Sequence, residues 1–265
     1  MTLCLSKIMD RILLLIPFGY FAKTRLHGWQ SLFFHSYTEW LSSVVILHLI
    51  GGYELVESGL LFLQAYLCFI SFYELGYFVN DYYYTQREPK PRARLSAFRI
   101  THGFVAAFFL IRVTAFVGLG IRLFADNSMF WYFYLLLATV FSLHNGLRKT
   151  EIKVVTFVGL AFFRFFAPFL FFVGKASAVT LVPAVLLGYV LMRTLGYMDS
   201  KDLLNMPQRK LASFKVSFYL LLFPVSATIS LLQESYLTLL ANVYFALPWL
   251  TLAAIPTRAT RMDAP

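Results

Sequence analysis

Two groups of acidic residues, separated by more than a hundred positions, are the parts of this sequence best suited to chemistry. The first is Asn80-Asp81 with Glu88 seven positions later, and the second is Asp199 with Asp202 three positions later. Carboxylate and amide oxygens are the ligands that hard cations such as Mg²⁺ prefer. Mg²⁺ ions held between the two groups could bridge a diphosphate and stabilise it as a leaving group. We expect all five residues to be metal ligands, and the three aspartates to be catalytic.

Helical spacing supports this grouping. If the chain continued as a helix, Asp81 and Glu88 would lie on one face two turns apart, and Asp199 and Asp202 would be neighbours on one face. Two like charges that lie so close favour a metal ion or a basic partner between them. The alternative for each segment is a solvated loop, in which an acid such as Asp202 pairs with Lys201.

Basic residues accompany these acids. Arg92 follows the first acidic group, Arg148 ends a polar segment that begins at His144, and Arg193 precedes Asp199 by six positions. Arginine side chains suit phosphate oxygens, because their donors match the geometry of the anion. The alternative is that Arg92 and Arg148 are ordinary positive charges at the cytoplasmic ends of membrane helices.

The composition indicates that membrane helices position these residues. Of the 265 residues, 59% are hydrophobic and only 14% are charged, and the mean hydropathy is +0.69. Soluble domains are nearer half apolar and a quarter charged, so most of this chain must face lipid or other helices. Because a span takes about 20 apolar residues, we predict an all-α bundle of about eight (seven to nine) spans: Leu32–Ile50, Leu60–Val79, Phe98–Gly120, Met129–Leu143, Val154–Val173, Thr180–Met198, Phe214–Leu232 and Tyr236–Ile255.

The basic residues also predict the topology. With eight spans, most of the 23 Lys and Arg residues fall on the side that holds both termini, and only Arg122 and Lys175 fall in loops on the other side. Cytoplasmic loops carry such an excess, so we predict cytoplasmic termini, with the acidic groups on the same face. The distribution explains the net charge of +10 without a nucleic-acid partner.

The N-terminal segment and three arginines complete the pattern. Ile8–Phe21 is apolar, short and flanked by basic residues, without a small-residue cleavage site after it, so we expect an interfacial helix. Arg112, Arg164 and Arg193 fall inside predicted spans, where charge is expensive and usually faces the bundle interior. We favour structural ion pairs for Arg112 and Arg164, with Glu74 or Glu39 as possible partners of Arg164.

Taken in order along the chain, these segments resemble the signatures of the UbiA superfamily of intramembrane prenyltransferases. The first signature, Asn-Asp followed by further acids and an Arg/Pro-rich stretch, is similar to NDYYYTQREPKPR at 80–92. The second, a spaced pair of Asp, is similar to Asp199 and Asp202. His144 and Arg148 take the places of a Tyr and a Lys that often lie between the signatures, and RLHGW at 25–29 resembles the Arg-Pro-x-x-Trp of some branches.

The chain departs from the family pattern at several positions. Tyr84 stands in the place of the middle acid of the first signature, and Glu88 stands where Asp is usual. Asn205 and Met206 replace the Gly-Asp that often follows the second signature, and the usual ninth span is not evident. Fewer carboxylates would mean one fewer metal, an altered donor or lost catalysis.

The resemblance implies a single transmembrane domain over 1–265, with an N-terminal interfacial segment (1–31), a helical bundle (32–255) and a C-terminal tail (256–265). The bundle would enclose a lateral, lipid-open cavity, with Mg²⁺ holding a prenyl diphosphate at its cytoplasmic mouth. Ionisation would give an allylic cation that an aromatic or other lipophilic acceptor captures. In this hypothesis the diphosphate would be bound by Arg25, Arg92, Arg148 and Lys201, and the substrate would be positioned by Tyr84, His144 and Arg193.

Three other functions remain open at the level of sequence. Some relatives cyclise the prenyl chain themselves, and others move phosphoribose onto a prenyl phosphate. The third is non-enzymatic: a small transporter or a membrane partner subunit that uses Arg112, Arg164 and Arg193 as a polar path.

Overall fold

The computed structural model describes residues 9, 11–85, 94–96, 98 and 100–254. Regular structure in these residues is entirely helical, which confirms the all-α prediction. The chain divides into two compact units, Met1–Gly174 and Lys175–Pro265, and each is described by itself.

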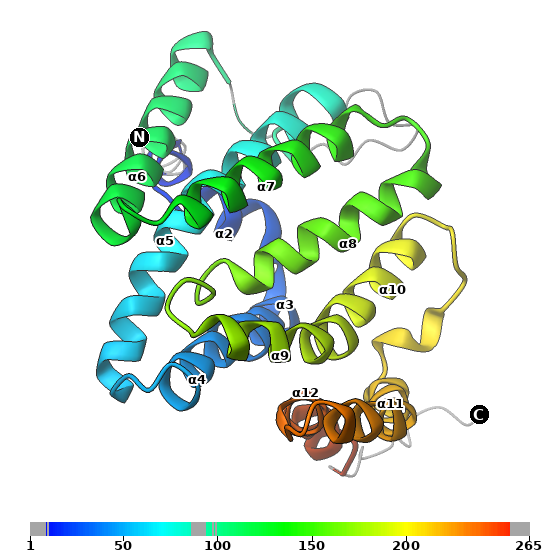
Figure 1. Cartoon of the computed structure of the whole chain (residues 1–265). Helices are drawn as coiled ribbons and strands as arrows, with labels where there is room; N and C mark the ends of the chain where they lie inside the picture. The colour runs from blue at the N-terminus through cyan, green and yellow to red at the C-terminus, as the bar shows by residue number, and fades with distance from the viewer. Residues whose placement is uncertain (1–8, 10, 86–93, 97, 99, 255–265) are drawn as a thin grey trace, which may run out of the picture. The chain divides into compact units, whose positions relative to one another are not determined.

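The first unit is built around one long helix, α5 (Leu55–Val79), which a π-helical segment, Asn80–Tyr84, extends. This helix packs against α2, α4, α6 and α7, while α8 packs against α7 (Figure 1). This unit also contains α2 (Gly19–Arg25), α3 (Gly28–His35), a π-helical segment (Ser36–Leu41), α4 (Ser42–Leu49), α6 (His102–Phe124), α7 (Ser128–Gly146) and α8 (Thr150–Phe166).

The second unit contains a helical hairpin. Helices α11 (Ala212–Leu232) and α12 (Leu237–Ala254) pack against each other, and α9 packs against α12. The Asn242 amide donates to the Tyr219 carbonyl across the hairpin (3.0 Å). The other helical segments are α9 (Lys175–Val185), a π-helical segment (Leu186–Val190), α10 (Leu191–Ser200) and a 3₁₀ turn (Pro207–Lys210).

Five helices of the described residues are long and apolar enough to cross a membrane, and they coincide with five of the predicted spans: Leu55–Tyr84, His102–Phe124, Lys175–Ser200, Ala212–Leu232 and Leu237–Ala254. Leu110, Val113 and Ile121 of α6 are exposed, as are Leu221 and Leu231 of α11. Exposed apolar rows of this extent indicate a membrane protein, because lipid covers such surface without cost.

The other three predicted spans are helical but differ from their predicted form. Leu32–Ile50 contains a π-helical segment, and Glu39 within it is buried. The helix predicted over Val154–Val173 ends at Phe166, because Pro168 lacks a backbone donor and disfavours helix at the preceding residue. The helix predicted over Met129–Leu143 extends over Ser128–Gly146. The count of eight spans stays a prediction.

Gly76 lets α5 and α7 approach closely. A Cβ atom at this position would lie 2.5 Å from the Phe141 ring. We expect Gly76→Ala to lower the free energy of unfolding by about 1–3 kcal/mol, the usual cost of overpacking a core. Thermal unfolding of the detergent-purified protein measures this, with Gly118→Ala as the control, because a Cβ at Gly118 meets no atom within 4 Å. Equal stability of the two variants would contradict the prediction.

Candidate functional site

Asp81 is the most densely bonded of the predicted metal ligands. It lies in the π-helical segment Asn80–Tyr84, and its side chain is fully buried. Oδ2 accepts hydrogen bonds from the Tyr20 hydroxyl (2.7 Å) and from Arg25 Nη2 (2.8 Å). Oδ1 accepts from Arg94 Nη1 (3.1 Å) and from the Asn80 amide (3.4 Å). The carboxylate is therefore held by two cations and two neutral donors.

The charges of this Asp81 cluster (Tyr20, Arg25, Asn80, Asp81 and Arg94) favour anions. Burial, and then the neighbouring carboxylate of Asp81, raises the pKa of Tyr20 well above its usual value. The phenol therefore stays protonated and can donate. Two guanidiniums flank the Asp81 carboxylate, and their side chains keep 13% (Arg25) and 24% (Arg94) exposure.

Tyr20 and Arg25 reach Asp81 because the N-terminal segment folds back against α5 and α6. The chain reverses at Phe18, whose φ of 77° lies in the left-handed region. The amides of Phe18 (3.2 Å) and Phe21 (2.7 Å) donate to the two carboxylate oxygens of Glu74. Glu74 thus accepts backbone donors that the turn leaves without helical partners.

Arg112 holds the other side of the same segment. It donates to the carbonyls of Leu15 (2.7 Å), Leu14 (2.9 Å) and Ile16 (3.1 Å), and its Nη2 lies 2.7 Å from Glu74 Oε2. Both charged side chains are fully buried. The predicted structural ion pair at Arg112 is confirmed, and it binds irregular backbone that lipid could not satisfy.

A second buried ion pair lies in the same unit. Arg164 Nε donates to Glu39 Oε2 (2.9 Å), and His35 Nδ1 lies 2.9 Å from Glu39 Oε1. Arg164 Nη1 also donates to the Tyr77 hydroxyl (2.8 Å). Of the two predicted partners of Arg164, Glu39 is the one it binds, whereas Glu74 binds Arg112.

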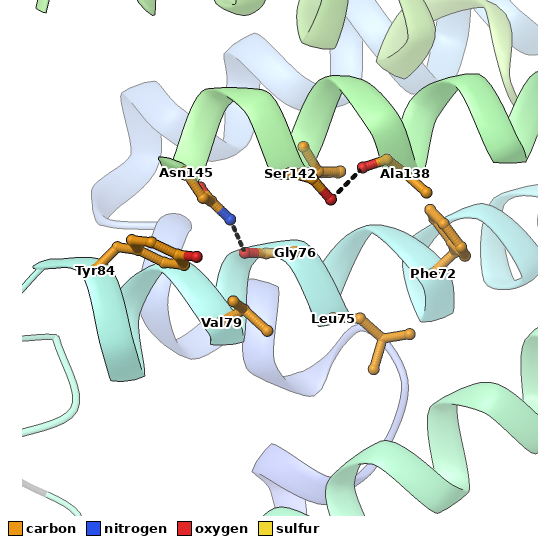
Figure 2. A pocket seen from close by; sticks show the side chains of 9 residues that line it. Phe72, Leu75, Gly76, Val79, Tyr84, Ala138, Ser142 and Asn145 are labelled. Atoms are coloured by element: carbon orange, nitrogen blue, oxygen red, sulfur yellow. Dashed lines mark hydrogen bonds between the residues drawn. The ribbon is translucent and has the colours of Figure 1, made fainter. Parts of the chain in front are cut away.

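A pocket of about 230 Å³ is lined by residues of α5, of the Asn80–Tyr84 segment and of α7. Figure 2 shows Tyr84 and Asn145 at one end and Phe72 at the other. The Asn145 amide donates to the Gly76 carbonyl (3.4 Å), and most of the lining is apolar: Phe72, Leu75, Val79, Ala138 and Phe141. Tyr84, predicted to position the substrate, therefore lies at the mouth of an apolar groove.

His144 and Arg148 lie at the end of α7 and directly after it. His144 Nδ1 lies 2.8 Å from the Thr156 hydroxyl, which itself donates to the Lys153 carbonyl (3.0 Å). Because the hydroxyl has one proton, we infer that His144 Nδ1 carries the proton of their shared hydrogen bond. Arg148 is exposed in the turn before α8, and no contact of the described residues joins it to Asp81.

In the second unit, Asp199 closes a loop. It accepts from the Met206 amide (2.9 Å) and from Arg209 Nε. Helix α10 ends at Ser200, and Asp202 adopts a left-handed conformation with φ 59°. The Asp202 amide donates to the Asp199 carbonyl (3.2 Å) and the Leu203 amide to the Met198 carbonyl (3.0 Å), which is a Schellman cap. Asp199 and Asp202 therefore do not share the face of a continuing helix.

Lys201 and Arg193 belong to the same unit. Lys201 follows α10 directly, and the Arg193 guanidinium lies 5.9 Å from the centre of the Tyr189 ring on the preceding turn. Their predicted roles in phosphate binding and substrate positioning remain predictions.

The Asp81 cluster unites three residues that were predicted for one site: Arg25, Asn80 and Asp81. Tyr20 and Arg94 were not predicted. A tyrosine in an apolar stretch carries no motif, and Arg94 is one of several basic residues after the first signature. Glu88 and Arg92 lie outside the described residues.

The described residues around Asp81 do not form a Mg²⁺ site of the predicted composition. Asp81 is the one carboxylate of the cluster, and donors occupy both of its oxygens. Among the described residues, no group of three or more His, Cys, Asp or Glu could hold a metal ion. The remaining predicted ligands are Glu88, which is not described, and the two aspartates of the second unit.

The arrangement can bind an anionic group, because two guanidiniums, Arg25 and Arg94, flank Asp81 and are partly exposed. Phosphate oxygens compete well for arginine, since each contact is a charge-assisted hydrogen bond. Comparison with family models, with curated proteins and with solved structures finds no match for this chain.

Proposed function

We propose that this chain is a UbiA-type integral membrane enzyme, which transfers a prenyl group from a prenyl diphosphate to an aromatic or other lipophilic acceptor with the help of Mg²⁺. One observation carries the proposal. Arg25, expected to bind diphosphate, and Asp81, expected to act beside it, are 56 positions apart in the sequence, yet their side chains meet at 2.8 Å. The RLHGW segment at 25–29 and the first signature thus each contribute one side chain to the Asp81 cluster.

In this proposal Arg25 and Arg94 each give up a hydrogen bond to Asp81 and donate to the diphosphate instead. In the structure both donate to Asp81. An entering diphosphate offers several anionic oxygens, so each guanidinium can turn a donor toward it. The allylic carbon–oxygen bond then breaks, the electron pair leaves with the diphosphate, and the acceptor forms the new bond to the carbon and loses a proton. Mg²⁺ held by the proposed ligands Asn80, Asp81, Glu88, Asp199 and Asp202 would supply positive charge to the leaving diphosphate, and Asp81 would bind it only after giving up one of its present donors.

The apolar pocket beside α5 suits the prenyl chain. Its volume of about 230 Å³ is below the ~300–1,000 Å³ of pockets for drug-sized ligands, and its lining is mostly apolar, as binding of a prenyl chain requires. Tyr84 at its mouth belongs to the same π-helical segment as Asp81. The pocket thus extends away from the segment that carries the proposed head-group site.

The proposed topology follows the charge distribution. About eight spans would place both termini, and the ends of the helices that carry the acidic groups, on the cytoplasmic side. The bundle would open sideways to the lipid, so that the prenyl diphosphate and the acceptor could enter its cavity from the membrane.

One observation favours a non-enzymatic rival. Both oxygens of Asp81 are bonded, and Asp199 closes a loop, so each acid has a structural role as it stands. A transporter or partner subunit would need no more than this. Assays of catalysis distinguish the two functions.

The test is diphosphate release. Membranes that contain the full chain are incubated with geranyl, farnesyl and geranylgeranyl diphosphates, with and without Mg²⁺ and aromatic acceptors. Arg25→Ala and Arg94→Ala should each lower kcat/KM by about 100-fold, because a hydrogen bond between charged groups contributes ~1.5–3 kcal/mol. Arg122→Ala, at an exposed arginine near the end of α6, should leave the rate unchanged.

Other outcomes separate the alternatives. Diphosphate release that is unaffected by Asp81→Ala and Asp199→Ala contradicts the proposal. Diphosphate release without Mg²⁺ contradicts the proposed role of the metal. A cyclised product formed without acceptor indicates a cyclase. Consumption of phosphoribosyl pyrophosphate with a prenyl phosphate indicates phosphoribosyl transfer.

A further inference from the structure

Arg25 has a second contact that fixes its plane. Its guanidinium carbon lies 4.3 Å from the centre of the Tyr77 ring, so the cation rests on the ring face while its edge donates to Asp81. Tyr77 and Asp81 are four positions apart along α5 and its extension, which places them on neighbouring turns. One helix therefore offers Arg25 both an aromatic face and a carboxylate.

Tyr77 is itself held by residues of α8 and α2. Arg164 Nη1 donates to its hydroxyl at 2.8 Å, and Phe21 stacks on its ring with an interplanar angle of 7°. Arg164 is 2% exposed and is neutralised by Glu39. A buried arginine is expensive to place in a bundle, and this one uses a donor to fix the ring beneath Arg25.

Each of the two arginines that contact Tyr77 has a carboxylate partner. Asp81 pairs with Arg25 and Glu39 pairs with Arg164, while the Tyr77 side chain contacts both cations. Without the Tyr77 ring, Arg25 would keep only its bonds to Asp81 and to the Thr24 carbonyl (3.3 Å) among those described. The position of the Arg25 guanidinium thus depends on Tyr77, whose hydroxyl Arg164 binds.

We propose that Tyr77 and Arg164 are positioning residues of the Asp81 cluster: the Tyr77 ring holds the Arg25 guanidinium in place to receive a phosphate group, and Arg164 holds the Tyr77 ring. The proposal rests on the proposed function for its ligand, but its geometric part concerns Arg25 alone. It assigns a role to a buried ion pair that the sequence suggests is merely structural.

The first measurement needs no ligand. The purified full-length protein is treated with phenylglyoxal, which modifies arginine, and the modification of Arg25 is followed by peptide mass spectrometry. Tyr77→Leu should raise the Arg25 rate by about 10-fold, which corresponds to ~1.4 kcal/mol and lies within the range of cation–π contacts. Tyr77→Phe keeps the ring and should raise the rate by about 3-fold, owing to the lost hydrogen bond from Arg164.

The second measurement uses inorganic pyrophosphate as the probe, with titration calorimetry at two salt concentrations. Affinity should fall by about 10-fold in Tyr77→Leu and about 3-fold in Tyr77→Phe. Phe69→Leu is the control, since Phe69 is a buried aromatic two turns earlier on α5 that packs against Tyr66 and Tyr73. It should leave both readouts unchanged.

The outcomes separate the two proposals. Unchanged Arg25 modification in Tyr77→Leu overturns the positioning role, whatever binds. Wild-type protein that binds no pyrophosphate, but shows the expected modification rates, overturns the proposed function and keeps the positioning of Arg25. If Tyr77→Phe and wild type have equal Arg25 modification rates and pyrophosphate affinities, Arg164 has no positioning role. If Tyr77→Phe and Tyr77→Leu have equal values of both, the ring face of Tyr77 does not position Arg25.

Discussion

Replacing Arg112 by methionine should lower the free energy of unfolding by at least about 4 kcal/mol, because breaking a buried ion pair costs ~3–5 kcal/mol and backbone acceptors lose their donor as well. Arg112 donates to the carbonyls of Leu14, Leu15 and Ile16 and pairs with Glu74. Its loss leaves a carboxylate buried without its cation. Thermal and denaturant unfolding of the detergent-purified protein measure the effect.

A comparison of two double variants tests the reason for this cost. Glu74→Met with Arg112→Met removes both charges but leaves the backbone groups without partners, so stability should stay at least about 3 kcal/mol below wild type. Glu39→Met with Arg164→Met removes an ion pair whose described hydrogen bonds go to side chains. That double variant should recover to within about 1–2 kcal/mol, since well-packed apolar replacements of buried pairs are often tolerated. Equal recovery of the two would mean that the backbone contacts of Arg112 contribute little.

The helical architecture could be predicted because it depends on local sequence. Apolar runs of sufficient length predicted the five helices that can cross a membrane. The free-energy cost of burying an unpaired charge predicted that Arg112 and Arg164 would form ion pairs. The end of α8 could also have been predicted, since Pro168 marks it. The π-helical segments could not, because tertiary contacts such as those of Glu39 and Asp81 stabilise them rather than any local propensity.

The site could be predicted only in part, because it depends on a long-range return of the chain. The Asn80-Asp81 pair and Arg25 are visible as motifs, but their contact requires the turn at Phe18. That turn is stabilised by Glu74 and Arg112 from two other helices, and neither has a motif that predicts it. Tyr20 enters the site through the same turn, so it has no signal of its own.

The negative charge of Asp81 should weaken the binding of anions to the Asp81 cluster. Asp81 accepts hydrogen bonds from Arg25 and Arg94, and its negative charge opposes theirs. Asp81→Asn keeps the size of the side chain but removes that charge. Pyrophosphate affinity measured without Mg²⁺ should therefore rise by about 10-fold, or ~1.4 kcal/mol, which is a modest part of the ~3 kcal/mol between unit charges about 5 Å apart at an effective dielectric of 20.

Turnover should change in the opposite direction. If Asp81 takes part in transfer as proposed, Asp81→Asn should lower kcat by about 100- to 1,000-fold, as loss of one preorganised electrostatic group does in other enzymes. Tighter binding with slower turnover cannot come from unfolding, which would weaken both. Asp126→Asn, an exposed acid between α6 and α7, should change neither value. Weaker pyrophosphate binding in Asp81→Asn would show that the two arginines are not the anion site, and unchanged turnover would leave Asp81 as the structural clamp of Tyr20, Arg25 and Arg94.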